Sequence, residues 1–147
     1  MGGVCGHSHK YIPQGDPGYF SRASLHQSFS VVTGACLLVR RDVYEAVGGL
    51  DERLAIAFND IDFCLRVRNL GYRNVWKPYA EMNHHESASR GNDNTPSKQK
   101  RFSDEVDFMK LRWGTALLND PAYSPNLTLD SEDFSYAWPP RTKGFFE

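Results

Sequence analysis

Cysteine is scarce in this sequence, and long hydrophobic runs are absent from it. The three cysteines, Cys5, Cys36 and Cys64, are an odd number in apolar surroundings and offer no framework of disulfides. Such cysteines are typical of reduced thiols in a cytosolic protein. The longest apolar-leaning run, Val31–Val39, is interrupted by a threonine and a glycine and is far too short to cross a membrane. The first residues have no basic region followed by an apolar core, so they do not indicate a signal peptide.

An excess of charge of either sign is also missing. The chain has 17 Lys and Arg against 18 Asp and Glu, a formal net charge of -1. That balance gives no reason to expect a nucleic-acid partner or binding to an anionic membrane surface. There is no GxGxxG motif and no P-loop, so no phosphate-binding glycine loop is predicted. A length of 147 residues fits one domain or a large part of one.

The most informative stretch that is present covers residues 58–66, Phe-Asn-Asp-Ile-Asp-Phe-Cys-Leu-Arg. It places two carboxylates at the start of an otherwise apolar helix, which we predict from Asp60 to Leu70 with Gly71 ending it. At about 100° per residue, the apolar residues form two stripes on opposite sides. One stripe contains Ile61, Cys64 and Leu65, and the other contains Phe63, Val67 and Leu70. A helix that is apolar on two sides is expected to lie buried between layers of an α/β fold.

The same geometry puts Asp60 and Asp62 on opposite sides of the helix, so the two carboxylates cannot do the same job. Asp60 is either a helix cap or a catalytic base facing a cleft. The dipole at the helix N-terminus would keep it ionised. Asp62 is expected to have an orienting role, either through contact with an acceptor or through an ion pair with Arg66 at i+4.

Two strands are predicted around this helix. Val31–Val39 reads as a buried strand, because it is β-branched at the start and apolar at the end. Its small residues, Gly34 to Cys36, mark either a close approach to the backbone or the packing of a neighbouring helix. The second strand is Tyr72–Tyr79, followed by a short extended piece from Ala80 to His84.

The remaining elements are two helices and two irregular segments. A short helix opens at Arg40–Asp42 and runs through Val47, where two glycines stop it. The clearest helix runs from Lys98 to about Leu117. It carries one sustained apolar stripe, which consists of Phe102, Val106, Met109, Trp113 and Ala116 or Leu117. Residues 1–30 read as loop, as do residues 87–101, which have almost no apolar side chains.

Four motifs, in this order, resemble the C-terminal half of family 2 glycosyltransferases, most closely the bacterial rhamnosyltransferase and O-antigen type. They are Val-Thr-Gly-Ala-Cys-Leu-Leu-Val-Arg-Arg at 32–41, Gly-Gly-Leu-Asp-Glu at 48–52, Asn-Asp-Ile-Asp-Phe-Cys-Leu-Arg at 59–66 with Gly-Tyr at 71–72, and His84 with Ser89. The resemblance covers about residues 1–130.

The resemblance implies the α/β fold called GT-A, a Rossmann-like layer that binds nucleotide-diphospho-sugars. This chain would be its C-terminal, acceptor-side portion, with residues 1–118 in the catalytic domain. Independently of the resemblance, the prolines and scattered aromatic residues of 119–147 predict an extended tail that wraps the domain or contacts a neighbour.

The resemblance also implies roles for individual residues. In the family the second residue of an acidic pair is the general base, and Asp60 matches it. Asn59 stands where the family usually has Glu or Asp, and with Asp62 it is expected to bind or orient the acceptor. A later histidine completes the metal site, and His84 matches it, with His85 as the alternate. The metal would be Mg²⁺ or Mn²⁺.

Basic residues after these histidines suggest a contact with the donor. Arg90, Lys98 and Arg101 could close on the donor diphosphate, or they could belong to a solvated basic loop.

By resemblance, the chain is the acceptor-binding half of an inverting glycosyltransferase. It would move a sugar from a nucleotide-diphosphate donor to a cell-surface glycan or a lipid-linked acceptor. It would act in the cytoplasm, with the inner face of the membrane and peripheral membrane contact left open. The nucleotide-binding half of the family, with its DxD metal motif, does not occur in this sequence, so the isolated chain is expected to be inactive.

Two other functions are kept as alternatives. One is a non-catalytic remnant that forms a homodimer through an exposed sheet or through the tail. The other is a small metal hydrolase that uses His7, His9, Asp60 and His84.

Overall fold

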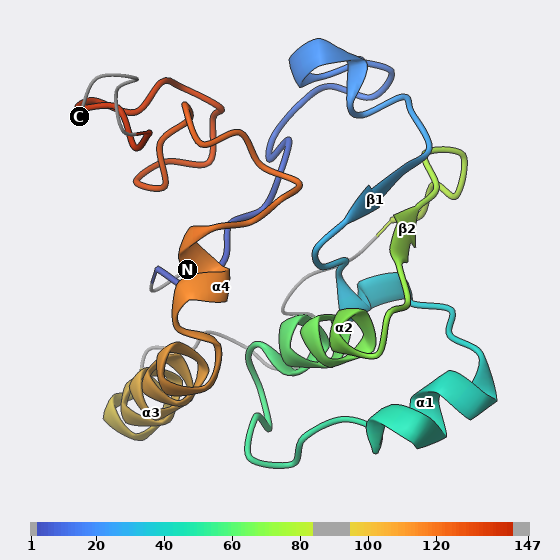
Figure 1. Ribbon diagram of the computed structural model, residues 1–147, viewed down its shortest axis with the longest axis vertical. Helices are drawn as coiled ribbons and strands as arrows, with labels where there is room; N and C mark the ends of the chain where they lie inside the picture. Colours follow the sequence, from blue (N-terminus) through green and yellow to red (C-terminus); the bar gives the residue numbers. More distant parts are fainter. Residues whose placement is uncertain (1–2, 84–94, 143–147) are drawn as a thin grey trace.

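The computed structural model describes residues 3–83 and 95–142, which combine four α-helices with two short strands (Figure 1). In chain order the elements are η1 Tyr19–Ser21, β1 Gln27–Phe29, η2 Gly34–Cys36, α1 Arg41–Val47, α2 Asn59–Asn69, β2 Asn74–Trp76, α3 Pro96–Trp113 and α4 Thr115–Leu118, where η marks a 3-10 helix. The mixture of helix and strand agrees with the predicted α/β class. None of the helices in the described part of the chain has the length and apolar content needed to cross a membrane.

The sheet consists of β1 and β2, which pair antiparallel with Ser28 opposite Val75. It is joined to α2 by the buried side chain of Asn74. The Nδ2 of Asn74 donates to the carbonyl of Ser30 at 2.8 Å and to that of Cys64 at 3.1 Å. A buried amide that satisfies two carbonyls in this way fixes the sheet against the helix.

The prediction of a strand at Val31–Val39 is wrong. The first strand ends at Phe29, and Gly34–Cys36 forms η2 instead. The hydroxyl of Thr33 accepts a hydrogen bond from the backbone N–H of Ala35 at 3.2 Å, which favours a turn over a ladder. Beyond η2 the chain alternates as an extended segment should, because Leu37 and Val39 face the core while Leu38 is 97% exposed.

The second predicted strand is confirmed only in part. Of Tyr72–Tyr79, residues Asn74–Trp76 form β2. The expected extended piece after Ala80 shows no strand in the described residues 80–83, and its last residue, His84, lies outside the described part of the chain.

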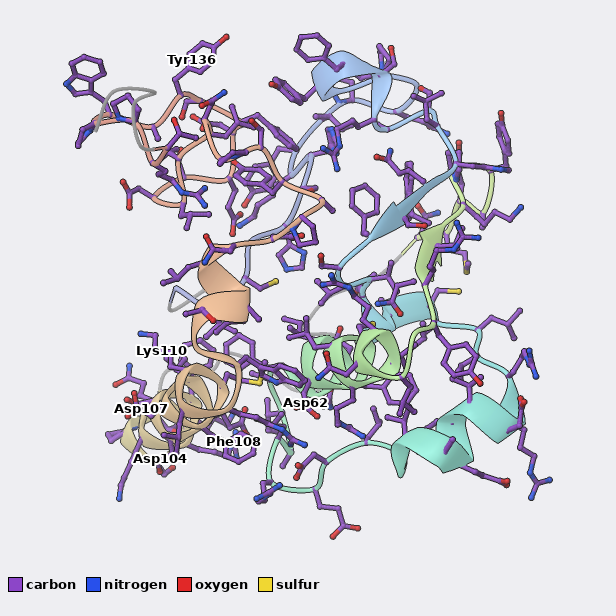
Figure 2. All side chains as sticks on the ribbon, viewed as in Figure 1. Asp62, Asp104, Asp107, Phe108, Lys110 and Tyr136 are labelled. Carbon is purple, nitrogen blue, oxygen red and sulfur yellow. The ribbon has the colours of Figure 1, made fainter. Side chains whose placement is uncertain are left out.

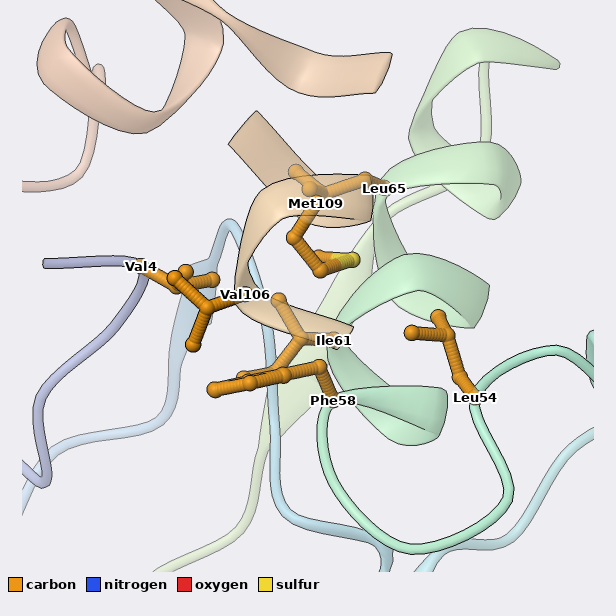
Figure 3. Close-up of a cluster of buried hydrophobic side chains, with 7 residues drawn as sticks. All are labelled: Val4, Leu54, Phe58, Ile61, Leu65, Val106 and Met109. Atoms are coloured by element: carbon orange, nitrogen blue, oxygen red, sulfur yellow. The ribbon is translucent and has the colours of Figure 1, made fainter. Parts of the chain in front are cut away.

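The predicted helix around Asp60 is confirmed as α2, and its two apolar stripes feed two separate clusters. Cluster one joins α2, α3, the loop before α2 and the N-terminal segment (Figure 3). It consists of Val4, Leu54, Phe58, Ile61, Leu65, Val106 and Met109. Cluster two consists of Val43, Phe63 and Val67 and packs α1 against α2. The exception is Leu70, which is 52% exposed at the helix end.

The predicted helices at either side of α2 are also present. The helix expected from Arg40–Asp42 through Val47 is α1, and Gly48 stops it in the left-handed region with φ +84°. The helix expected from Lys98 to Leu117 begins at Pro96 and is broken at Gly114, so that α4 follows α3 as a separate turn. Val106 and Met109 of its predicted stripe are buried in cluster one.

The segment after α4 packs against the N-terminal segment rather than extending into solvent (Figure 1). The ring of Phe134 stacks on that of Tyr19, with centroids 4.6 Å apart. The Nη2 of Arg22 donates to the carbonyl of Ala122 at 2.8 Å. Two residues remote from the helices, Leu127 and Ala137, are buried by this packing.

A buried carboxylate joins α2 to α3. Asp62 is fully buried, and its Oδ2 accepts from Arg66 Nε at 2.7 Å. Its Oδ1 accepts from Trp113 Nε1 at 2.9 Å and lies 3.2 Å from Arg112 Nη1. The ion pair with Arg66 is the one predicted at i+4. Arg66 Nη1 also donates to the carbonyl of Val47 at 2.8 Å, which adds the end of α1 to the same network.

Replacing Asp62 with Asn should destabilise the fold strongly. The substitution keeps the shape but leaves the largely buried Arg66 without a counter-charge, and removing one partner of a buried pair costs about 3–5 kcal/mol. Urea unfolding followed by circular dichroism measures the loss. The matched control is Asp107→Asn, which removes the same charge from an exposed position on α3 and should change the free energy of unfolding by less than about 0.5 kcal/mol. Equal effects for both variants would show that the network contributes little.

Candidate functional site

Asp60 lies in the first turn of α2, half-buried, and both of its carboxylate oxygens accept backbone hydrogen bonds. Oδ2 accepts from the N–H of Gly34 at 2.6 Å, and Oδ1 accepts from the N–H of Ile61 at 2.8 Å. The first turn of a helix favours negative charge. The carboxylate is therefore held in one orientation by two segments that are far apart in the sequence.

Gly34 is required by the close approach of Asp60. A Cβ at position 34 would lie 3.0 Å from the Cβ of Asp60 and 3.3 Å from its Oδ2. The prediction that small residues at Gly34 to Cys36 mark a close approach is confirmed, and the group that approaches is the candidate base. The alternative prediction, that a neighbouring helix packs against these small residues, holds as well, because Asp60 belongs to the first turn of α2.

Asn59 supports the same turn. Its Oδ1 accepts from the N–H of Asp60 at 2.7 Å, so this side chain helps to fix the residue that follows it. The N-cap, Phe58, has φ +63°, which is unfavourable for a residue with a side chain. Backbone strain of this kind persists where the surrounding structure enforces it, and it is concentrated at functional sites.

The two carboxylates differ sharply in access. Asp62 is fully buried and engaged with Arg66 and Trp113, whereas Asp60 is partly exposed. The side chain of Asp62 labelled in Figure 2 lies between α2 and α3. Direct contact of Asp62 with an acceptor is not supported by this geometry, and the alternative, the ion pair, is what the structure contains.

Two thiols near Asp60 are kept neutral. Burial, assisted by the negative charge of Asp60, raises the pKa of Cys5 to about 11. Burial also raises the pKa of Cys64, again with a contribution from Asp60. A neutral thiol is a poor nucleophile, so neither cysteine competes with Asp60 as the reactive group.

The basic residues predicted to contact the donor are brought together only in part. Lys98 and Arg101 line one pocket of about 300 Å³ at the N-terminal end of α3, together with Ile56, Gln99, Phe102 and Glu105. The Nε of Arg101 is buried and has no hydrogen-bond partner among residues 3–83 and 95–142. Arg90 lies outside the described residues, as do His84 and His85.

The described residues do not form a complete metal site. Among residues 3–83 and 95–142, no three His, Cys, Asp or Glu side chains lie close enough to hold an ion. His9 packs against Phe134 with ring centroids 4.9 Å apart, where the N-terminal segment contacts the segment after α4. The hydrolase alternative, which needs His7, His9 and Asp60 at one ion together with His84, is therefore not supported by the described residues.

Glu105 was not among the residues singled out from the sequence. It is 3% exposed on α3, and its carboxylate accepts from the N–H of Ile56 at 3.3 Å and of Ala57 at 2.7 Å. A signal was present, because Glu105 lies on the apolar stripe between Phe102 and Val106. A carboxylate on a buried stripe needs hydrogen-bond donors from elsewhere in the fold.

Replacing Gly34 with Ala should displace Asp60. The new Cβ would compress the carboxylate against its backbone donor, and overpacking of this kind costs about 1–3 kcal/mol. Urea unfolding of the variant should show that loss. The matched control is Gly6→Ala, whose Cβ would meet only the flexible side chain of Glu132 at 3.0 Å. Both variants gain the same small stabilisation through the unfolded chain, so the difference between them isolates the contact with Asp60. Identical stabilities would contradict the close approach.

Comparisons with known proteins give relatives over most of the chain. A family model described as "Glycosyltransferase like family 2" matches residues 17–116. The uncharacterized protein y4gI of Sinorhizobium fredii (strain NBRC 101917 / NGR234) is 54% identical over 140 residues, 95% of this chain and 15% of that protein. The O-antigen biosynthesis protein RfbC of Myxococcus xanthus is 34% identical over 134 residues, 90% of this chain and 10% of RfbC.

A third relative names a reaction. The N-acetylglucosaminyl-diphospho-decaprenol L-rhamnosyltransferase of Mycobacterium tuberculosis is 42% identical over 62 residues, 42% of this chain and 20% of that enzyme. The chain thus spans only 10–20% of the length of these three relatives. No solved structure matches it. Because the family model covers more than half of the chain, this protein belongs to the family 2 glycosyltransferases, as the motifs around Asp60 predicted.

Proposed function

We propose that this chain is the acceptor-side part of an inverting glycosyltransferase, with Asp60 as the general base. The donor would be a nucleotide-diphospho-sugar, and the acceptor a cell-surface glycan or a lipid-linked glycan. Membership of the family supports glycosyl transfer in general. The names of two relatives, an O-antigen biosynthesis protein and a rhamnosyltransferase acting on a diphospho-decaprenol, support the class of acceptor.

Sugar transfer requires one residue of this chain to accept a proton from the acceptor hydroxyl. An acceptor hydroxyl attacks the anomeric carbon of the donor, the new glycosidic bond forms, and the bond to the diphosphate breaks with its electron pair. The hydroxyl proton passes to the carboxylate of Asp60. Base assistance of this kind contributes about 10²–10⁴-fold.

The observation that carries the proposal is the contrast between the paired carboxylates. Asp60 is partly exposed and oriented by the N–H of Gly34 at 2.6 Å. Asp62 is fully buried on the other side of the helix, in an ion pair with Arg66. A helix cap needs only the hydrogen bond within α2. It would not explain why the N–H of Gly34, from η2, donates to Oδ2 of Asp60.

Replacing Asp60 with Asn should lower sugar transfer by about 10²–10⁴-fold, because the amide cannot accept the proton. The rate is measured on the protein in its full encoded length, by incorporation of labelled sugar into acceptor. Binding of the nucleotide-sugar, measured by calorimetry, should be unchanged. The control is Asp42→Asn, which removes a charge from an exposed position in α1 and should leave transfer unaltered. Transfer at the normal rate by the Asp60 variant would end the assignment.

The pocket on α3 supports a second part of the proposal, a contact with the donor diphosphate. Lys98 and Arg101 both line this pocket, at neighbouring turns of α3. A bound anion would give the buried Nε of Arg101 the hydrogen-bond acceptor that the described residues do not supply. Arg90 remains a predicted third contact.

Arg101→Ala should weaken binding of the nucleoside diphosphate by about tenfold, equivalent to one charge-assisted hydrogen bond. Titration calorimetry with the free nucleoside diphosphate is the measurement. Lys100→Ala is the matched control, since Lys100 is exposed on the same turn and is not part of the pocket lining. An equal loss in the two variants would indicate a general charge effect and not a site.

Other predictions remain untested. Mg²⁺ or Mn²⁺ with His84 or His85 as ligand depends on residues outside the described part of the chain. A nucleotide-binding part supplied by another segment, inactivity of the isolated chain, homodimer formation and a cytoplasmic location at the inner face of the membrane likewise stay predictions.

A further inference from the structure

The loop that leads into the candidate site has no regular structure of its own. Residues 55–58 lie between Leu54 and α2 without a helical or strand pattern, although Phe58 is buried and Ala57 is half-buried. Backbone N–H groups in such a place need partners, because a buried N–H without one costs free energy comparable to a lost hydrogen bond. The partner is on α3, about fifty residues further along the chain.

Glu105 supplies both acceptors. Its Oε1 accepts from the N–H of Ile56 at 3.3 Å and its Oε2 from the N–H of Ala57 at 2.7 Å. The side chain is 3% exposed, and hydrogen bonds to an ionised acceptor are roughly twice as strong as neutral ones. Each oxygen serves one of two consecutive N–H groups, so the carboxylate fixes the orientation of that peptide segment as well as its position.

The next residue in the chain has the strained backbone. Phe58 has φ +63° and ψ +3°, in the left-handed region that is unfavourable for a residue with a side chain. Its ring is 4% exposed in cluster one and lies against the ring of Phe102, with centroids 5.5 Å apart. Phe102 and Glu105 are one turn apart on α3, so a single face of this helix holds the loop by a side-chain contact and by two hydrogen bonds.

The strained residue sets the start of α2. Phe58 is the N-cap, and its carbonyl accepts the hydrogen bond from the N–H of Asp62 at 2.9 Å. Asp60 is two residues beyond Phe58, and its Oδ2 must meet the N–H of Gly34 at 2.6 Å. A change in the peptide at Ala57 is therefore passed along the backbone to the carboxylate of Asp60.

We propose that Glu105 is a positioning residue for Asp60, because its buried carboxylate holds the peptide N–H groups of Ile56 and Ala57 and thereby enforces the left-handed N-cap at Phe58. Glu105 also lines the pocket of Lys98 and Arg101, but both of its carboxylate oxygens are engaged by the loop. It acts through the loop, from a helix that otherwise contributes apolar packing and the basic pocket. The inference rests on the proposed role of Asp60 as base.

The test substitutes Glu105→Gln, which keeps the size but can accept only one of the two N–H groups, since its amide nitrogen is a donor. In the full-length protein, kcat for sugar transfer should fall at least about tenfold, because a displacement of about 1 Å costs on the order of 100-fold. KM for the acceptor should stay within about threefold. The matched control is Asp104→Asn, which removes the same charge from the adjacent, exposed position, on the side of α3 away from α2 (Figure 2), and should leave kcat unchanged.

A double-mutant cycle separates positioning from general stabilisation. If Glu105 acts through Asp60, the Glu105→Gln substitution should have no further effect on kcat in an Asp60→Asn background. An equal fall in both backgrounds, or an unchanged kcat in the single variant, would overturn the proposal. If Asp60→Asn alone transfers sugar normally, the proposed function fails, and the cycle identifies that outcome separately.

A measurement on the unaltered chain keeps the inference testable if Glu105→Gln does not fold. The amide protons of Ile56 and Ala57 should exchange slowly with solvent, although they lie outside any helix or strand. Nuclear magnetic resonance of the labelled protein reports each amide. The N–H of Glu52, an exposed residue earlier in the same connection, should exchange fast and serves as the reference. Rapid exchange of the amide protons of both Ile56 and Ala57 would contradict their hydrogen bonds to Glu105.

Discussion

The buried carboxylate of Asp62 is the constraint on which the arrangement of the helices depends. A charge without access to water must be paired and hydrogen-bonded, and Asp62 recruits Arg66 from its own helix and Trp113 from α3. Arg66 extends the network to the carbonyl of Val47 at the end of α1. These contacts fix the rotation of α2 about its axis. Once that rotation is set, the residue two positions earlier must face the opposite side, and Asp60 meets η2 there.

The candidate site is built from three segments that the chain brings together over long separations. Gly34 donates to Asp60 across 26 residues, and Glu105 holds the preceding loop across nearly 50. The strain at Phe58 is offset by burial of its ring in cluster one. The result is a carboxylate with a defined orientation on a rigid support, which is what a general base needs if it is to meet a hydroxyl at the moment of attack.

Periodicity predicted the helices well, and the reasons are local. The two stripes of α2 separate into clusters one and two, and Gly48 stops α1 in the left-handed region. The strand expected at Val31–Val39 failed because composition describes how apolar a segment is, not whether a neighbour pairs with it. There the hydroxyl of Thr33 and the carboxylate of Asp60 take the N–H groups of Ala35 and Gly34, so the backbone turns where a ladder was expected.

From the sequence alone, the motif order and the helical period determined the family, the position of the carboxylate pair and the fact that its members face opposite ways. The position and the opposite directions of the two carboxylates are properties of residues close together in the chain, and the motif order is read directly along it. Only the tertiary structure decided which carboxylate is open to solvent, what approaches Gly34, and that Glu105 holds the loop before the site. Those outcomes depend on contacts between residues 26 to 51 positions apart. The spacing of side chains along one helix contains no information about which backbone N–H groups another segment leaves unpaired.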